Sequence, residues 1–251
     1  MSEMPFALSG KRILVAGGTR GIGRAISAHF ARSGAHVIAN YARNDEAARG
    51  LKEEMSVGAS LDLCRADLTT QEGKQRVLNA VGQTQLSGLV YAAATGVHRP
   101  VADLTLRHWD FTFALNVRAF FDLVLALRPR LGPGSSVVAI SSEGAVRAFP
   151  NYTLVGATKG ALEALCRHLA LDLAPHGIRV NILSPGTVLT QALDAFPDKD
   201  GFVRKAIERS PRGRLTTPEE VAHAAHFLCC AASAGLNGHT LVVDGGQRIT
   251  G

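Results

Sequence analysis

The sequence lacks the features that mark most secreted and membrane-spanning proteins. It has only four cysteines in 251 residues, with neither zinc-ligand nor CxxC spacing. Its longest apolar stretch, residues 109–127, is interrupted by polar and charged side chains, so it is a poor membrane span. The opening MSEMPFALSGKR has no cationic segment followed by an apolar one, as a secretion leader would. These absences predict a cytoplasmic protein with free thiols and no membrane partner.

The sequence also has no tract of charges of one sign. The chain carries 27 basic and 21 acidic residues, and the basic residues are scattered rather than gathered into a tract. Aromatic residues make up only 6% of the chain and do not interleave with the basic ones, so we predict no nucleic-acid partner. The nine histidines are dispersed and have no supporting carboxylates, so we also predict no metal site.

Apolar residues, by contrast, make up 46% of the chain and follow a regular order. Strand-length apolar runs alternate with longer segments of helical period. Runs such as ILVA and SVVAI are continuously apolar, as expected when both faces of a parallel sheet are covered. We predict strands at residues 12–16, 36–40, 61–65, 88–92, 135–141, 179–183 and 240–243. Residues 1–251 are therefore predicted to form one α/β domain, a Rossmann-type doubly wound parallel sheet with helices on both faces.

One segment breaks this alternation. Residues 187–216 follow the sixth predicted strand and contain prolines and clustered charges. An insertion at the carboxyl end of a sheet is well placed to cover a bound ligand. We therefore predict that residues 187–216 form a substrate lid.

A glycine-rich sequence lies between the first predicted strand and the first predicted helix. It reads Gly17-Gly18-Thr19-Arg20-Gly21-Ile22-Gly23. Glycines let the backbone turn tightly and approach a pyrophosphate, which is held by the free N–H groups at the start of the helix. A plain glycine turn is the alternative, but the position between strand and helix favours a dinucleotide site.

The second predicted strand indicates which dinucleotide binds. NAD sites usually place a carboxylate at this strand end to take the ribose hydroxyls. Here the strand ends Asn40-Tyr41-Ala42-Arg43, and the first acid is Asp45. Arg43 and Arg20 could hold a 2′-phosphate by charge-assisted hydrogen bonds, unless both are ordinary surface arginines. The sequence therefore predicts NADPH as the cofactor.

The glycine spacing, GxxxGxG, resembles that of the short-chain dehydrogenase/reductase superfamily. Further matches run along nearly the whole chain, at Asp67, Asn116, Ser142, Lys159, Asn181 and Pro185-Gly186. The resemblance implies that Asp67 hydrogen-bonds the adenine and that Thr187 and Thr190 lie near the nicotinamide amide and the phosphates. The chain departs from the family pattern at Ala16, where threonine is usual. It also has Tyr91-Ala92-Ala93-Ala94 where Asn-Asn-Ala-Gly is typical, so the backbone there must be supported differently.

The expected proton donor is displaced in this sequence. Members that reduce carbonyls have a tyrosine four positions before the lysine, but here that position is Val155, which cannot donate a proton. Tyr152 instead lies seven positions before Lys159. Seven residues at about 100° each complete nearly two helical turns, so we expect the two side chains on one helix face.

The chemistry of enoyl reduction gives a reason for the displacement. Hydride then goes to the β carbon of an α,β-unsaturated thioester, and negative charge develops on an oxygen several bonds away. A hydroxyl that stabilises this enolate must stand farther from the hydride donor. The tyrosine–lysine spacing resembles that of the enoyl-acyl-carrier-protein reductases, most closely the NADPH-dependent third bacterial type. The similarity extends to residues 93–101, 108–110, 151–165 and 242–246.

The resemblance implies an NADPH-dependent enoyl thioester reductase of fatty-acid biosynthesis, acting on acyl carrier protein or coenzyme A thioesters as a homotetramer. Tyr152 would hydrogen-bond the thioester carbonyl and Lys159 the ribose hydroxyls. Ser142 would orient the carbonyl, and Asn116 would support the lysine. The predicted cofactor-binding residues are Gly17, Thr19, Arg20, Gly21, Ile22, Gly23, Arg43, Asp67, Leu68, Lys159, Pro185, Gly186, Thr187 and Thr190. Two alternatives stay open: a 3-oxoacyl reductase with a shifted tyrosine, and an inactive nucleotide-binding homologue.

Overall fold

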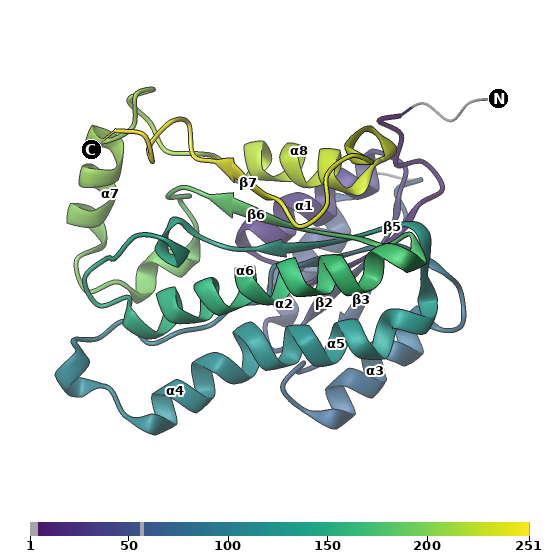
Figure 1. Ribbon diagram of the computed structural model, residues 1–251, viewed down its shortest axis with the longest axis horizontal. Helices are drawn as coiled ribbons and strands as arrows, with labels where there is room; N and C mark the ends of the chain where they lie inside the picture. Colours follow the sequence, from purple (N-terminus) through teal and green to yellow (C-terminus); the bar gives the residue numbers. More distant parts are fainter. Residues whose placement is uncertain (1–4, 56–57, 251) are drawn as a thin grey trace.

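Seven parallel strands form the centre of the computed structural model, which describes residues 5–55 and 58–250 (Figure 1). The strand order is β3-β2-β1-β4-β5-β6-β7. The doubly wound sheet predicted from the apolar runs is confirmed. The strands are β1 (Arg12–Ala16), β2 (His36–Tyr41), β3 (Leu61–Arg65), β4 (Leu86–Tyr91), β5 (Leu131–Ile140), β6 (Arg179–Pro185) and β7 (Thr240–Val243).

Helices cover both faces of the sheet. The helices are α1 (Gly21–Arg32), α2 (Asp45–Glu54), α3 (Gln71–Val81), α4 (Leu106–Phe113), α5 (Phe120–Leu127), α6 (Thr153–Leu173), α7 (Lys199–Glu208) and α8 (Pro218–Cys229). Helices α1 and α8 pack on one face, and α3, α4, α5 and α6 lie along the other (Figure 1). Each face has its own buried apolar cluster, because the strands alternate their side chains between the two helical layers.

The strand order reverses between β1 and β4, which are neighbours in the sheet but not in the sequence. Their chains depart in opposite directions beyond Ala16 and Tyr91, which are cross-strand partners. Such a reversal opens a crevice at the carboxyl ends of the strands, where α/β proteins bind their ligands. The loops that follow β1, β4, β5 and β6 therefore supply the candidate site.

Two predicted strands start earlier than their apolar runs indicate. β4 begins at Leu86 rather than residue 88, and β5 begins at Leu131 rather than residue 135. Leu86 pairs with Leu131, and the register then shifts before Gly88 pairs with Ser136. The sequence hides this pairing because Gly-Pro-Gly follows Leu131 and reads as a turn.

The irregular segment after β6 contains a short helical turn, Gln191–Ala195, and helix α7. An isolated parallel bridge joins Val188 to Thr216, so the two ends of the insertion lie side by side. The predicted boundaries of 187–216 match this excursion, and its role as a substrate lid stays a prediction.

Within the described ranges, the structure contains no helix with the length and apolar character needed to cross a bilayer. The opening MSEMPFALSGKR, for which no secretion leader was predicted, lies partly outside the described residues, which begin at residue 5.

Candidate active site

The glycine loop after β1 has no space for side chains at Gly17, Gly18 and Gly23. A Cβ on Gly17 would stand 2.7 Å from the backbone nitrogen of Ala93, and the φ of Gly17 is +72°. A Cβ on Gly23 would overlap the carbonyl oxygen of Gly17. Helix α1 begins at Gly21, and its N-cap residue Arg20 makes no side-chain capping bond. The N–H groups of the first turn are therefore available to an anion such as a pyrophosphate.

The end of β2 presents a cation, while its nearest acid is already hydrogen-bonded. Asp45, the first acid after this strand, accepts hydrogen bonds from the Tyr41 phenol and from Arg65, each at 2.9 Å. The Asn40 amide is also committed, because it donates to the carbonyl oxygens of Cys64 and Ala66. Arg43 is exposed and lines the cavity. The residues present therefore fit a nicotinamide dinucleotide, and the 2′-phosphate stays a prediction.

The predicted adenine contact is held by its own loop. Asp67 Oδ1 accepts hydrogen bonds from the backbone nitrogen and the hydroxyl of Thr69, at 2.9 and 2.7 Å. These bonds lower the pKa of the Asp67 carboxyl, with Arg43 adding to the effect, so the group is ionised and oriented. Leu68 is buried and lines the same cavity.

The predicted nicotinamide side lies beyond β6. Pro185 is the last residue of β6, and a Cβ on the next residue, Gly186, would approach Asp244 Cβ to 2.8 Å. The backbone nitrogen of Thr187 donates to Gln247 Oε1 at 3.2 Å. Thr190 lies against Gly21, so the start of the lid segment borders the phosphate loop. The predicted cofactor residues thus share one cavity, although their individual contacts stay predictions.

Tyr152 lies beside Ser142, but not inside the helix. It is the N-cap residue of α6, with φ −110° and ψ 10°, so it lies at the helix start rather than within the helix, and both Tyr152 and Lys159 line the cavity. The Tyr152 phenol donates a 3.3 Å hydrogen bond to Ser142 Oγ, which also accepts from the Gly144 nitrogen at 3.1 Å. Burial raises the pKa of the Tyr152 phenol, so it stays protonated at neutral pH.

Gly144 sets the position of this phenol. A Cβ on Gly144 would overlap Cε1 of the Tyr152 ring. We therefore expect Gly144→Ala to displace the ring and lower kcat by about tenfold through loss of alignment. Fluorescence titration with NADPH should show unchanged affinity. Equal kcat in the variant would contradict a fixed ring position as a requirement for turnover.

Lys159 is buried and donates from Nζ to the carbonyl oxygen of Ile140 at 2.8 Å. Burial lowers its pKa to about 8, while the Glu163 carboxylate acts in the opposite direction. Glu163 is itself buried and accepts a 2.6 Å hydrogen bond from Ser141. The ammonium is thus held close to its own titration range at the floor of the cavity.

This pKa predicts an alkaline loss of activity. Lys159 must be protonated to attract ribose oxygens, and its charged fraction falls as the pH rises through about 8. We expect kcat/KM for NADPH to fall with an apparent pKa near 8, since the Tyr152 phenol titrates far higher. Lys159→Arg, which stays charged, should lose this limb in its residual activity. A wild-type profile that stays flat to pH 9.5 would contradict the assignment.

Asn116 bridges two elements beside the cavity, and its support of Lys159 through water or backbone contacts stays a prediction. It lies in a π-helical segment, Ala114–Ala119, between α4 and α5. Its side chain accepts from the nitrogen of Thr95 and donates to the oxygen of Thr95, both at 2.9 Å, and it donates to Thr158 Oγ1. Asn116 therefore fixes the loop after β4 to helix α6 and makes none of these bonds to Lys159.

The unusual Tyr91-Ala92-Ala93-Ala94 sequence is supported from the same segment. The buried Tyr91 phenol donates to the carbonyl oxygen of Leu115 at 2.6 Å. A long tyrosine thus ties the end of β4 to the π-helical segment. This bond explains how the chain holds the loop without the usual asparagines, as the sequence required.

Sequence reasoning missed the aromatic wall of the cavity, which has a volume of about 780 Å³. Phe196 stacks on Phe202 with a ring-centroid distance of 4.5 Å, and it faces the Tyr152 ring at 5.8 Å. Phe149 meets Tyr152 edge-on at 6.0 Å, and His98 packs on Phe196 at 4.4 Å. These rings come from separate segments of the chain, Phe202 from helix α7 and the others from loops or a helix end, so the sequence signals them only by the several aromatic residues near Tyr152 and within residues 187–216.

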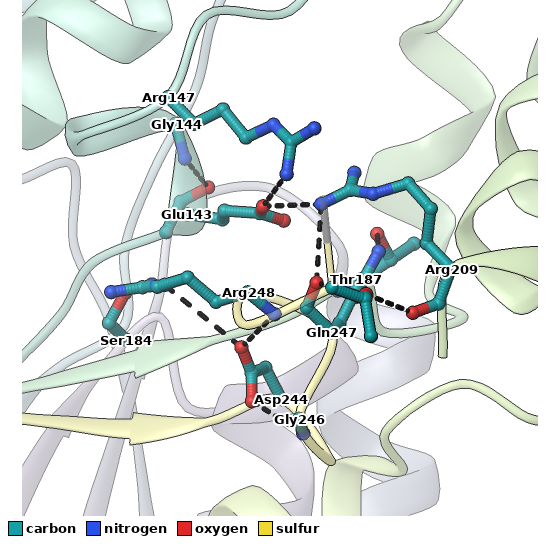
Figure 2. A network of polar contacts seen from close by, with 12 residues as sticks. Glu143, Gly144, Arg147, Ser184, Thr187, Arg209, Asp244, Gly246, Gln247 and Arg248 are labelled. Atoms are coloured by element: carbon teal, nitrogen blue, oxygen red, sulfur yellow. Dashed lines mark hydrogen bonds and ion pairs between the residues drawn. The ribbon is translucent and has the colours of Figure 1, made fainter. Parts of the chain in front are cut away.

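Sequence reasoning also missed the buried carboxylate of Glu143, next to Ser142 (Figure 2). It accepts from Arg209 at 2.9 Å and lies 3.5 Å from Arg147. Arg209 follows α7, and it also donates to the carbonyl oxygen of Gln247. This polar network joins the turn after β5 to the lid segment and the carboxyl-terminal segment, so the lid is tied directly to the Ser142 loop.

Comparison with known proteins gives one family profile, described as Enoyl-(Acyl carrier protein) reductase, which matches residues 16–248. The chain is 34% identical to 1-cyclohexenylcarbonyl-CoA reductase of Streptomyces collinus, covering 94% of this chain and 86% of that protein. It is 31% identical to a tropinone reductase homologue of Arabidopsis thaliana, covering 100% and 97%. It is 32% identical to L-xylulose reductase of Mesocricetus auratus, covering 98% and 100%.

Solved structures agree with these relatives. A short-chain dehydrogenase/reductase from Serratia marcescens superposes with a TM-score of 0.88 at 30% identity, covering 97% of this chain and 99% of that one. A protein from Beutenbergia cavernae, described as an NAD(P)-dependent gluconate 5-dehydrogenase with NADP bound at low occupancy, gives 0.87 at 32% identity, covering 98% and 100%. The relatives share a fold and a redox chemistry but differ in the substrates that their names state.

Proposed function

Because the chain belongs to the short-chain dehydrogenase/reductase superfamily, we propose that this oxidoreductase is an NADPH-dependent reductase of 2-enoyl thioesters. One observation carries the proposal: the phenol beside Ser142 comes from Tyr152, while Val155 occupies the position four before Lys159. The family profile and the cyclohexenylcarbonyl-CoA reductase relative support the same chemistry.

The reduced nicotinamide, when bound, supplies the hydride that goes to the β carbon of the substrate. Lys159 and the glycine loop position that cofactor, and Tyr152 donates its hydrogen bond to the thioester oxygen. This oxygen gains negative charge as the hydride arrives, so the phenol stabilises the enolate and its transition state. On substrate binding the phenol turns its single O–H from Ser142 Oγ to the thioester oxygen, and the Ser142 hydroxyl can then donate to the phenol oxygen. The α carbon then takes a proton from Tyr152 or from water.

The test is NADPH oxidation with crotonyl-CoA, a longer 2-enoyl-CoA, the matching acyl-carrier-protein thioester and a 3-oxoacyl thioester. We expect turnover of the enoyl compounds and little of the oxo compound. The preference between the two carriers would indicate whether fatty-acid biosynthesis is the physiological setting, as we propose. Enoyl thioesters that bind without any NADPH oxidation would refute the proposal.

A 3-oxoacyl reductase is the second candidate, favoured by one observation. The hydroxyls of Tyr152 and Ser142 lie 3.3 Å apart, so both can reach a single carbonyl oxygen, as reduction of a ketone requires. Turnover of the 3-oxoacyl thioester alone would establish this reading. NADPH binding with turnover of neither substrate would instead favour an inactive nucleotide-binding protein.

The proposed assembly is a homotetramer. Helices α4 and α5 carry exposed apolar side chains, namely Trp109, Phe111, Phe121 and Leu125. Burial of such side chains between chains is a common source of association energy. Light scattering should give a mass about four times the 26.5 kDa of one chain.

A further inference from the structure

One polar atom in the cavity wall has no protein partner. Among the described residues, six side-chain nitrogen or oxygen atoms are buried without a hydrogen bond. His98 Nδ1 is the one that belongs to a residue lining the cavity. Buried polar atoms are almost always satisfied, so an unpaired imidazole in a wall of phenylalanines calls for an explanation.

The His98 ring packs against two aromatic rings of the cavity wall. Its centroid lies 4.4 Å from that of Phe196 and 5.5 Å from that of Tyr152. Burial lowers the pKa of His98, so the imidazole is neutral at pH 7. A neutral imidazole carries one N–H and one lone pair. Nδ1 meets neither a donor nor an acceptor, and a buried N–H without an acceptor is less tolerated than a bare lone pair, so we assign the proton to Nε2.

We propose that His98 Nε2 donates a second hydrogen bond to the substrate carbonyl oxygen, beside the bond from the Tyr152 phenol. The inference rests on the proposed function, because it assigns the oxygen that becomes the enolate. His98 transfers no proton in this role. Its neutral N–H stabilises charge that develops on the thioester oxygen, and an uncharged donor in an apolar wall is effective because competing water is excluded.

Contacts with neighbouring side chains hold the His98 imidazole beside Tyr152, where the substrate carbonyl oxygen is proposed to bind. The His98 loop is fixed by Asn116 through Thr95, and the rings of His98, Phe196 and Tyr152 form a cluster in which each ring packs against the other two. His98 and Tyr152 both line the cavity, so a substrate bound there can meet both side chains. The sequence offered a lone histidine after the fourth strand, and only the structure brings it to Tyr152.

The matched variants are His98→Phe and His98→Gln. Phenylalanine keeps a flat ring but removes the N–H, whereas the glutamine amide can place an N–H near the position of Nε2. We expect His98→Phe to lower kcat with crotonyl-CoA by about tenfold, less than loss of a sole donor because Tyr152 remains. NADPH affinity and the KM for crotonyl-CoA should change little, and His98→Gln should recover part of kcat.

A second readout does not depend on turnover. Difference infrared spectroscopy of crotonyl-CoA bound to the NADP⁺-loaded enzyme reports the thioester carbonyl stretch, which rises when a hydrogen bond is lost. We expect a higher frequency in His98→Phe than in the wild type and an intermediate one in His98→Gln. Equal kcat and equal frequency in His98→Phe would overturn the assignment, whatever the substrate. Wild-type enzyme that binds crotonyl-CoA without reducing it would refute the proposed function, and the frequencies would still decide on His98.

Discussion

Tyr152→Phe is expected to lower kcat with a 2-enoyl thioester by about 100- to 1,000-fold, as removal of a main oxyanion donor does. The variant keeps the ring, so the contacts with Phe196, Phe149 and His98 remain. It loses only the hydroxyl that bonds Ser142. The loss should fall on kcat, because the hydrogen bond strengthens as charge develops on the substrate oxygen. Steady-state kinetics with crotonyl-CoA measure it.

The control is Tyr91→Phe, which removes a buried phenol outside the cavity lining. Its hydroxyl bonds the carbonyl oxygen of Leu115, so the change should lower the free energy of unfolding by about 1 kcal/mol. We expect kcat to fall far less than in Tyr152→Phe, since the Tyr91 phenol supports the loop after β4 but does not itself line the cavity. A Tyr152→Phe enzyme as active as the Tyr91→Phe enzyme would remove Tyr152 from the mechanism.

Local pattern in the sequence is enough to predict the sheet and the phosphate loop. The apolar runs are continuous because both faces of each central strand are buried, and a run such as ILVA reads the same in any α/β protein. The glycines of the loop are likewise fixed by local backbone contacts, such as that between Gly23 and Gly17. The strands and the glycine loop both depend on a few neighbouring residues, so they can be predicted from the sequence.

The parts that sequence reasoning missed depend on distant partners. The π-helical segment forms where Asn116 bonds Thr95 and Thr158, which lie far away along the chain. The N-cap position of Tyr152 follows from the turn at residues 143–145, where Gly144 makes room for its ring. A helical wheel carries neither contact, so it placed Tyr152 within the helix, whereas the residue is its N-cap. The roles assigned to the site residues remain predictions for the experiments above.

The cofactor preference gives the second large effect. Arg43→Glu should lower kcat/KM for NADPH by about a hundredfold, because it replaces a charge-assisted hydrogen bond to the 2′-phosphate with repulsion. The new carboxylate stands at the end of β2, where ribose hydroxyls are bound in NAD enzymes. The kcat/KM for NADH should therefore stay equal or rise, and the ratio of the two values is the measurement.

Arg49→Glu is the matched control for this variant. Arg49 is also exposed, lies in α2 and does not line the cavity, so the net charge changes equally without a contact at the ribose. If only Arg43→Glu loses kcat/KM for NADPH, Arg43 contacts the phosphate directly. A general electrostatic effect would instead lower kcat/KM for NADPH in both variants at low salt, and this loss would vanish at high salt. Equal ratios of NADPH to NADH use in the wild type and Arg43→Glu would leave Arg43 as an ordinary surface residue, and the selectivity would then have to come from Arg20 and the glycine loop.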